Sequence, residues 1–238
     1  MKKDESKKLI EKLKEIYEVI KEYGVIEYGA SILELSQPQY AFLIETVKQL
    51  GAMADQTKLN CIIKGLSEDK NVETRMNELY TYVKQSKEHA FLVSDSFRKM
   101  MLSNSVTACC IMGIMLGDFT KENRNPTQYE TIVMRALSLF TDYDIRNFDE
   151  MIRNNYIIET ESGSKYIDIA KFPKDKKDGF MMTLDFCNQN RIFNYGSLVD
   201  GCGVVMDASI IDKVSELLFS YINRARRQMS YGIDDERG

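Results

Sequence analysis

The sequence has 238 residues and a formal net charge of −4, with 44% hydrophobic and 29% charged residues, an ordinary composition for a globular protein. A chain of this length buries one good core or two modest ones. Its acidic balance gives no overall attraction to nucleic acid or to an anionic membrane, so either would have to bind a local basic patch.

The five cysteines are Cys61, Cys109, Cys110, Cys187 and Cys202. An odd number without a Cys-x-x-Cys pair argues against a disulfide framework and against standard zinc spacing. We expect buried free thiols in a reducing compartment. No signal peptide is predicted, and the longest apolar run is too short for a membrane span. We therefore expect a cytoplasmic protein without membrane contact, and the lysine-, isoleucine- and asparagine-rich composition suggests a bacterial or phage origin.

The first predicted helix covers residues 6–23 and carries a coiled-coil-like apolar seam. The seam consists of Leu9, Leu13, Ile16, Ile20 and Tyr23. A helix of this length is marginal alone, so the seam must dock on another surface. That surface belongs either to this chain or to a second copy, and the seam is our candidate self-association contact.

Apolar spacing predicts further helices up to Met101. The next one starts at Ser36 and Pro38, and its stripe stops at Gly65. Two more stripes follow, one of Met76, Leu79, Tyr80 and Val83, and one of Ala90, Phe91, Val93, Phe97 and Met101. This half of the chain is therefore expected to be a helical bundle.

The segment between Lys99 and Asp118 carries no charge and is the most apolar of the chain. It predicts a helix ending near Asp118, with small residues at every fourth position: Ser105, Cys109, Gly113 and Gly117. On a helix these four share one face and allow another backbone to come very close. We predict that this helix is the packed centre of the fold.

A polar loop at residues 121–125 is the predicted domain boundary. The chain then reads as a helical bundle domain (1–122), a second domain (126–227) and a flexible tail (228–238). Asn125 and Pro126 are expected to start the next helix, with Asn125 as its cap. Thr141 and Asp144 form a second predicted capping pair.

Two β-hairpins are predicted in the second domain. In the first, residues 156–160 pair with 165–169 in a register that places Ile158 opposite Ile167. In the second, Asp200 and Gly201 form the turn between residues 198–199 and 204–205. A helix over residues 180–193 lies between the hairpins, and a final helix is capped by Ser209 and Asp212.

The predicted fold class is mainly α, a multi-helix N-terminal bundle followed by a small α+β part with two hairpins. From Gly179 onward the order of helix, Asp-Gly hairpin and helix resembles the second half of a winged-helix domain. In DNA-binding winged helices the helix before the hairpin enters the major groove. The resemblance implies base-reading side chains at Asn188, Gln189, Asn190 and Arg191, and phosphate contacts from Lys171, Lys174, Lys176, Lys177, Arg224, Arg226 and Arg227.

Enzymatic signatures are weak. His89 is the single histidine, and its position near a helix start is typical of a surface or capping residue. Four carboxylates, Asp142, Asp144, Asp149 and Glu150, could hold a divalent metal for phosphoryl transfer. They are also what the first turn of a helix favours. No catalytic residue, metal or cofactor is predicted, and no small-molecule ligand can be identified.

Three functions follow from these observations. The leading hypothesis is a non-enzymatic, cytoplasmic protein-interaction protein that binds a protein partner or itself. The alternative is a winged-helix DNA-binding transcriptional regulator. The second alternative is a metal-dependent, nuclease-like enzyme for phosphoryl transfer at Asp142 and Asp144.

Overall fold

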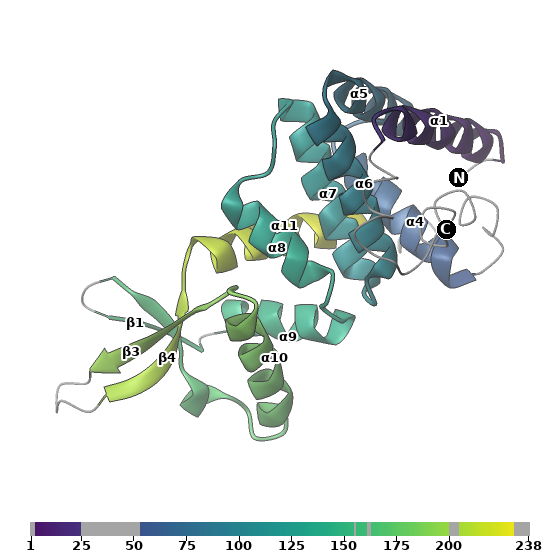
Figure 1. The fold of residues 1–238 in the computed structure, drawn as a ribbon. Coiled ribbons are helices and arrows are strands. Elements are labelled where there is room, and N and C mark those ends of the chain that lie inside the picture. Colours follow the sequence, from purple (N-terminus) through teal and green to yellow (C-terminus); the bar gives the residue numbers. More distant parts are fainter. Residues whose placement is uncertain (1–2, 25–52, 155, 161–162, 200–204, 231–238) are drawn as a thin grey trace, which may run out of the picture. The chain divides into compact units, whose positions relative to one another are not determined.

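The computed structural model describes residues 3–24, 53–154, 156–160, 163–199 and 205–230 (Figure 1). The helix start predicted at Ser36 and the Asp200–Gly201 turn lie outside these residues. The chain divides into two compact units. Unit 1 contains Met1–Leu102 and Cys109–Asn125, and unit 2 contains Ser103–Ala108 and Pro126–Gly238.

Unit 1 is helical throughout its described elements. These are α1 (Lys3–Glu22), α4 (Met53–Leu66), α5 (Val72–Gln85), α6 (Lys87–Leu102) and the greater part of α7 (Val106–Glu122). Each described stripe predicted from apolar spacing lies on one of these helices. Phe91 is an exception within its stripe, because 56% of its surface is exposed.

The apolar seam of α1 is covered by the chain itself. α1 packs on α5 and α6, and its Leu13, Ile16 and Ile20 are buried. The Tyr23 hydroxyl donates a hydrogen bond of 2.7 Å to the Lys84 carbonyl oxygen. Leu13, Ile16 and Ile20 are therefore covered within unit 1, while Tyr23 is half-buried. The side chain of Leu9 lies outside the described part.

α4 and α7 approach each other backbone to backbone. A Cβ atom at Gly113 would lie 2.5 Å from the Ile62 carbonyl oxygen, and one at Gly117 would lie 2.9 Å from the Leu66 carbonyl oxygen. A Cβ atom at Gly65 of α4 would likewise overlap the Cys110 carbonyl oxygen. Only glycine leaves room for this contact.

The other two small residues of the α7 stripe have different partners. The Cys109 thiol donates to the Met100 carbonyl oxygen of α6, at 3.1 Å. The Ser105 hydroxyl accepts from the Ala108 backbone N–H at 2.8 Å and so caps the helix. The helix also continues past Asp118 to Glu122, one turn longer than predicted.

Unit 2 combines helices with one small sheet. Its further elements are α8 (Gln128–Leu137), α9 (Asp142–Arg153), β1 (Ile157–Glu159), β2 (Lys165–Ile167), the 3-10 turn η1 (Ile169–Lys171), α10 (Lys177–Gln189), β3 (Asn194–Val199), β4 (Val205–Ile211) and α11 (Lys213–Ser230). α9 packs beside α10, and α11 packs on α8 and α9. Its core is rich in aromatic rings, with Phe172 and Phe180 edge to face at 5.1 Å.

The predicted capping pair of α9 is confirmed, since Thr141 and Asp144 form a reciprocal capping box. For α8 the prediction was wrong. Its cap is Thr127, whose hydroxyl accepts from the Glu130 N–H at 3.2 Å while the Glu130 carboxylate accepts from the Thr127 N–H at 2.7 Å. This box satisfies two backbone donors, whereas a single Asn125 cap satisfies one.

The two hairpins join into one antiparallel sheet of order β1-β2-β4-β3. The predicted register of the first hairpin was wrong by one residue, because Ile157, not Ile158, lies opposite Ile167. The physical reason is the turn. Gly163 has a φ of +82° and its N–H donates to the Thr160 carbonyl oxygen, while the Thr160 N–H donates to the Ser164 carbonyl oxygen at 2.9 Å, so Thr160 lies opposite Ser164 and not Lys165. Ile158 therefore faces the opposite side of the sheet.

The predicted boundaries of α10 and α11 also change. α10 ends at Gln189 rather than near Phe193, because Arg191 turns to a φ of +60° and the Ile192 N–H then donates to the Cys187 carbonyl oxygen at 2.8 Å. The cap of α11 is Asp212, paired with Ser215 at 2.8 Å. Ser209, its predicted partner, lies on β4. Residues 228–230, predicted as tail, are helical.

The predicted fold class is confirmed: the chain is mainly α, with a small antiparallel sheet in its C-terminal part. No helix in the described part of the chain has both the length and the apolar character needed to cross a membrane.

Candidate functional site

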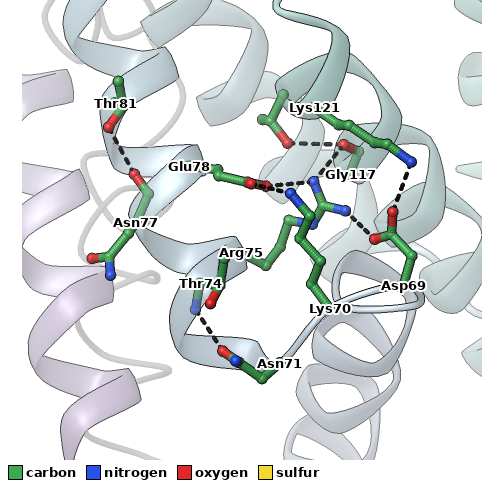
Figure 2. A network of polar contacts seen from close by, with 11 residues as sticks. Asp69, Lys70, Asn71, Thr74, Arg75, Asn77, Glu78, Thr81, Gly117 and Lys121 are labelled. Atoms are coloured by element: carbon green, nitrogen blue, oxygen red, sulfur yellow. Dashed lines mark hydrogen bonds and ion pairs between the residues drawn. The ribbon is translucent and has the colours of Figure 1, made fainter.

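A charged cluster in unit 1 surrounds Arg75, which is only 2% exposed. Its guanidinium pairs with Asp69 and with Glu78 (2.7 Å), and it donates to the Gly117 carbonyl oxygen at 3.2 Å. Figure 2 shows these groups converging from the α4–α5 connection, from α5 and from the C-terminal part of α7. Two carboxylates and a carbonyl oxygen face this buried cation, whose Nε atom makes no hydrogen bond within the described residues, and the contacts join three segments of unit 1.

Two lysines complete the cluster at its exposed rim. Lys70 pairs with Glu78, and Lys121 pairs with Asp69 at 2.8 Å. Burial by itself would raise the pKa of Asp69, but the hydrogen bonds and charges of Lys121 and Arg75 lower it to about 2. Asp69 is therefore ionised at neutral pH, and the cluster joins three basic side chains to two carboxylates.

The sequence contained a signal for this cluster that apolar spacing alone does not use. Arg75 falls on the buried stripe of α5, four residues before Leu79 and eight before Val83. A charged residue at a core position of a helix requires a partner, because isolated buried charge is costly. Glu78 lies three positions away, but Asp69 and Gly117 lie 6 and 42 positions away and could not be named from spacing.

A polar groove lies beside this cluster on unit 1, with a volume of about 450 Å³. It follows one face of α5 and the end of α7, and its lining consists of Thr74, Asn77, Glu78, Thr81, Tyr82, Gln85, Thr120 and Asn123. Every one of these side chains carries a hydrogen-bonding group. Figure 2 shows Thr74, Asn77 and Thr81 on successive turns of α5.

The single histidine packs against Tyr82, one of the residues that line this groove. The His89 ring stacks on the Tyr82 ring, with centroids 3.8 Å apart and planes 9° apart. Its Nδ1 atom lies 3.1 Å from the Tyr82 carbonyl oxygen, and its backbone N–H donates to the Ser86 hydroxyl. The Tyr82 hydroxyl donates to the Arg124 carbonyl oxygen at 2.9 Å, and burial raises its pKa to about 12.

In unit 2, several of the basic residues predicted to contact phosphates are held by carboxylates. The pairs are Lys171 with Asp168 (3.9 Å), Lys176 with Glu150 (2.7 Å) and Arg226 with Asp149. Arg224 lies over the Tyr221 ring at 5.2 Å, and Lys174, Lys177 and Arg227 are exposed. The adjacent Asp149 and Glu150 of α9 thus each bind one basic cluster, which weakens the positive potential between them.

The predicted base-reading residues are not gathered on one helix face. Asn188 donates to the Ser209 hydroxyl at 2.9 Å, and Asn190 donates to the Phe186 carbonyl oxygen at 2.9 Å. Asn190 and Arg191 lie beyond the end of α10, while Gln189 is its exposed last residue. The structure therefore brings Asn188 toward β4 and separates Arg191 from the helix.

The exposed face of α10 carries Asp178, Met182, Asp185 and Gln189, spaced as one helical stripe. Met182 is 74% exposed. Tyr143 of α9 is 54% exposed and lies over Gly179, one turn of α10 before Met182, where a Cβ atom would meet the tyrosine hydroxyl. We call the surface formed by Tyr143 and Met182 the α9–α10 face, and Leu139, four residues before Tyr143 in the chain, is 57% exposed.

The four carboxylates considered for metal binding have separate protein partners. Asp142 accepts from the Ser105 hydroxyl at 2.6 Å and from the Thr107 N–H at 3.0 Å, while Asp144 belongs to the α9 capping box. Asp149 and Glu150 are in the ion pairs described above. Among the described residues, no three His, Cys, Asp or Glu side chains are grouped to hold a metal ion.

The cysteines of α7 and α10 are in apolar surroundings. Burial raises the pKa of Cys110 to about 12, and it raises the pKa of Cys187 well above its usual value. Both thiols are therefore protonated at neutral pH and are poor nucleophiles.

No protein-family model matches this chain, and neither the curated proteins nor the solved structures contain a match to it.

Proposed function

We propose that this chain is a non-enzymatic protein-interaction protein, and that the α9–α10 face of unit 2 binds a protein partner. The observation that carries the proposal is the exposure of Tyr143, which lies over Gly179, and of Met182, which follows Gly179 by one turn of α10. Adjacent exposed apolar side chains mark protein interaction sites more often than chance. Tyrosine and methionine are also among the residues enriched at such interfaces.

The same helix argues against the DNA-binding alternative. A helix that enters the major groove must approach phosphates on both sides, and lysine and arginine supply most of that affinity. The exposed stripe of α10 instead holds two aspartates, one methionine and one glutamine, and no lysine or arginine. Lys176 and Arg226, which would have to contact phosphates, pair with carboxylates of α9.

The metal-dependent alternative also loses its donor set. Two-metal or one-metal phosphoryl transfer needs several carboxylates directed at one point. Here Asp142 caps the start of α7 and Asp144 caps α9, so both are engaged in holding helix ends. These contacts favour the proposed binding function over metal-dependent phosphoryl transfer at Asp142 and Asp144.

The experiment compares capture of partners by the full chain and by Met182→Glu. A charge at this exposed position removes the apolar contact without entering the core, so binding of the partner is expected to weaken about tenfold or more. Phe91→Glu is the matched control, because Phe91 is a large apolar residue of unit 1 that is 56% exposed. It is expected to capture the same partner as the unmodified chain.

Two outcomes would contradict the proposal. One is equal capture by Met182→Glu and the unmodified chain. The other is retardation of duplex DNA that Arg191→Ala with Lys176→Ala abolishes and Met182→Glu leaves intact, which would establish the winged-helix regulator instead. Sedimentation of the unmodified chain and of Met182→Glu measures their masses in solution. A mass larger than that of one chain, lost in Met182→Glu, would identify the partner as a second copy.

A further inference from the structure

The polar groove of unit 1 has an elongated lining. Thr74, Asn77, Thr81 and Gln85 occupy successive turns of α5, while Asn123 follows the end of α7. Eleven residues separate Thr74 from Gln85, which corresponds to about 16 Å along a helix. A linear ligand of that length fits such a lining better than a compact one.

The groups that line the groove are neutral amides and hydroxyls with one paired acid. The side-chain amides of Asn77, Gln85 and Asn123 make no hydrogen bond within the described part of the chain, and all three residues are exposed. Glu78 is neutralised by Arg75 and Lys70. An amide offers both donors and an acceptor, so it matches a ligand that presents both.

The composition of the lining excludes several ligand classes. No lysine, arginine or histidine is among the described lining residues, so a phosphate or carboxylate would lack a charged partner there. Tyr82 is the single aromatic residue among them. It is 1% exposed and its ring is stacked on His89, so it presents no platform for a nucleobase or a sugar ring.

We propose that this groove binds an extended peptide segment through its main chain. An extended main chain presents alternating N–H and C=O groups without net charge, and four residues span about 14 Å. The amides of Asn77, Gln85 and Asn123 would donate to and accept from those groups. This site is a second contact for the proposed protein-interaction function and uses none of the α9–α10 face.

The test uses a blocked tetraglycine peptide, which is a main chain without side chains, titrated into the full-length isotope-labelled protein. The expected result is a set of shifts in the NMR signals of the Asn77, Gln85 and Asn123 side-chain amides. The double variant Asn77→Leu with Gln85→Met should weaken binding about tenfold. Gln128→Met is the matched control, because Gln128 is an exposed glutamine on α8 of unit 2, and it should bind as the unmodified chain does.

The proposal is overturned if blocked tetraglycine shifts none of these three signals, or if the double variant binds it as well as Gln128→Met does. It is also overturned if the linear sugar maltotriose gives the same shifts, because the groove would then be a carbohydrate site. Met182→Glu should bind the peptide normally, so failure of the α9–α10 face and failure of the groove give different results.

Discussion

Two helix pairs in this chain meet through glycine, and they do so in different ways. In unit 1, α4 and α7 touch through their backbones, with Gly65, Gly113 and Gly117 facing carbonyl oxygens. In unit 2, α9 and α10 meet through side chains, with Asn147 donating to Thr183 at 3.0 Å and Tyr143 covering Gly179. A backbone atom cannot move away from an added Cβ atom, whereas the end of a tyrosine side chain can.

The largest effect is expected from Gly113→Leu in the α4–α7 contact. The new side chain would overlap the Ile62 carbonyl oxygen, which lies 2.5 Å from the Cβ position, so the two helices would have to separate. We expect a loss of about 3 kcal/mol or more in the free energy of unfolding, the upper part of the range for overpacking. Urea denaturation followed by circular dichroism measures it. An unfolding midpoint equal to that of the unmodified chain would show that this contact is not a rigid centre.

A smaller loss in the free energy of unfolding is expected from Arg75→Ala, which removes the guanidinium that joins the α4–α5 connection to α7. The carboxylates of Asp69 and Glu78 and the Gly117 carbonyl oxygen would lose a shared partner. The expected loss is about 2 kcal/mol, below the usual cost of breaking a buried pair because both carboxylates are partly exposed.

The control for that change is Arg75→Met, which keeps the buried chain length and removes the charge. If packing of the Arg75 stem matters more than its ion pairs, Arg75→Met will recover most of the lost stability in the same denaturation experiment. If the ion pairs dominate, the two variants will unfold at the same midpoint.

A still smaller change in stability, one that depends on pH, is expected from removing the Asp142 carboxylate of unit 2. Burial would raise the pKa of Asp142, but hydrogen bonds from Ser105 and Thr107 lower it below the usual value. Because the pKa is lower in the folded protein than the value of 3.8 in the unfolded chain, the ionised carboxylate stabilises the fold at any pH above 3.8. This stabilisation is lost as the pH falls from 3.8 through the pKa of the folded protein.

Asp142→Ala should therefore cost about 1 kcal/mol at neutral pH, as for a lost helix-terminal contact. The difference from the unmodified chain should shrink as the pH falls below 3.8. Unfolding midpoints measured across the acid range check the sign. A difference that stays constant with pH would mean that the carboxylate charge is not what holds the start of α7.

These contrasts also show how far sequence reasoning reaches. Apolar spacing located α1, α5, α6 and α7, and the Thr141–Asp144 capping box followed from local chemistry. The register of Ile157 with Ile167 could not be predicted, because a glycine at positive φ changed the loop length by one residue.

The sites were harder to predict for a related reason. The residues proposed to contact DNA were chosen by type, but their partners, such as Glu150 for Lys176, come from other helices. The polar groove was missed because its amides are spread over two helices and form no motif. Positions of exposed polar residues depend on how helices pack, and that information is not local in sequence.

The smallest change in the free energy of unfolding is expected from Gly179→Ala in the α9–α10 contact. Gly179→Ala adds a Cβ atom that would meet the Tyr143 hydroxyl, yet that hydroxyl is the far end of a side chain that is 54% exposed. Tyr143 can rotate toward solvent at little cost, while alanine is favoured over glycine inside a helix by up to about 1 kcal/mol. We expect the free energy of unfolding to stay within about 0.5 kcal/mol or to rise. A loss as large as that of Gly113→Leu would mean that Tyr143 is fixed over α10, and that the α9–α10 face is as rigid as the backbone contact of unit 1.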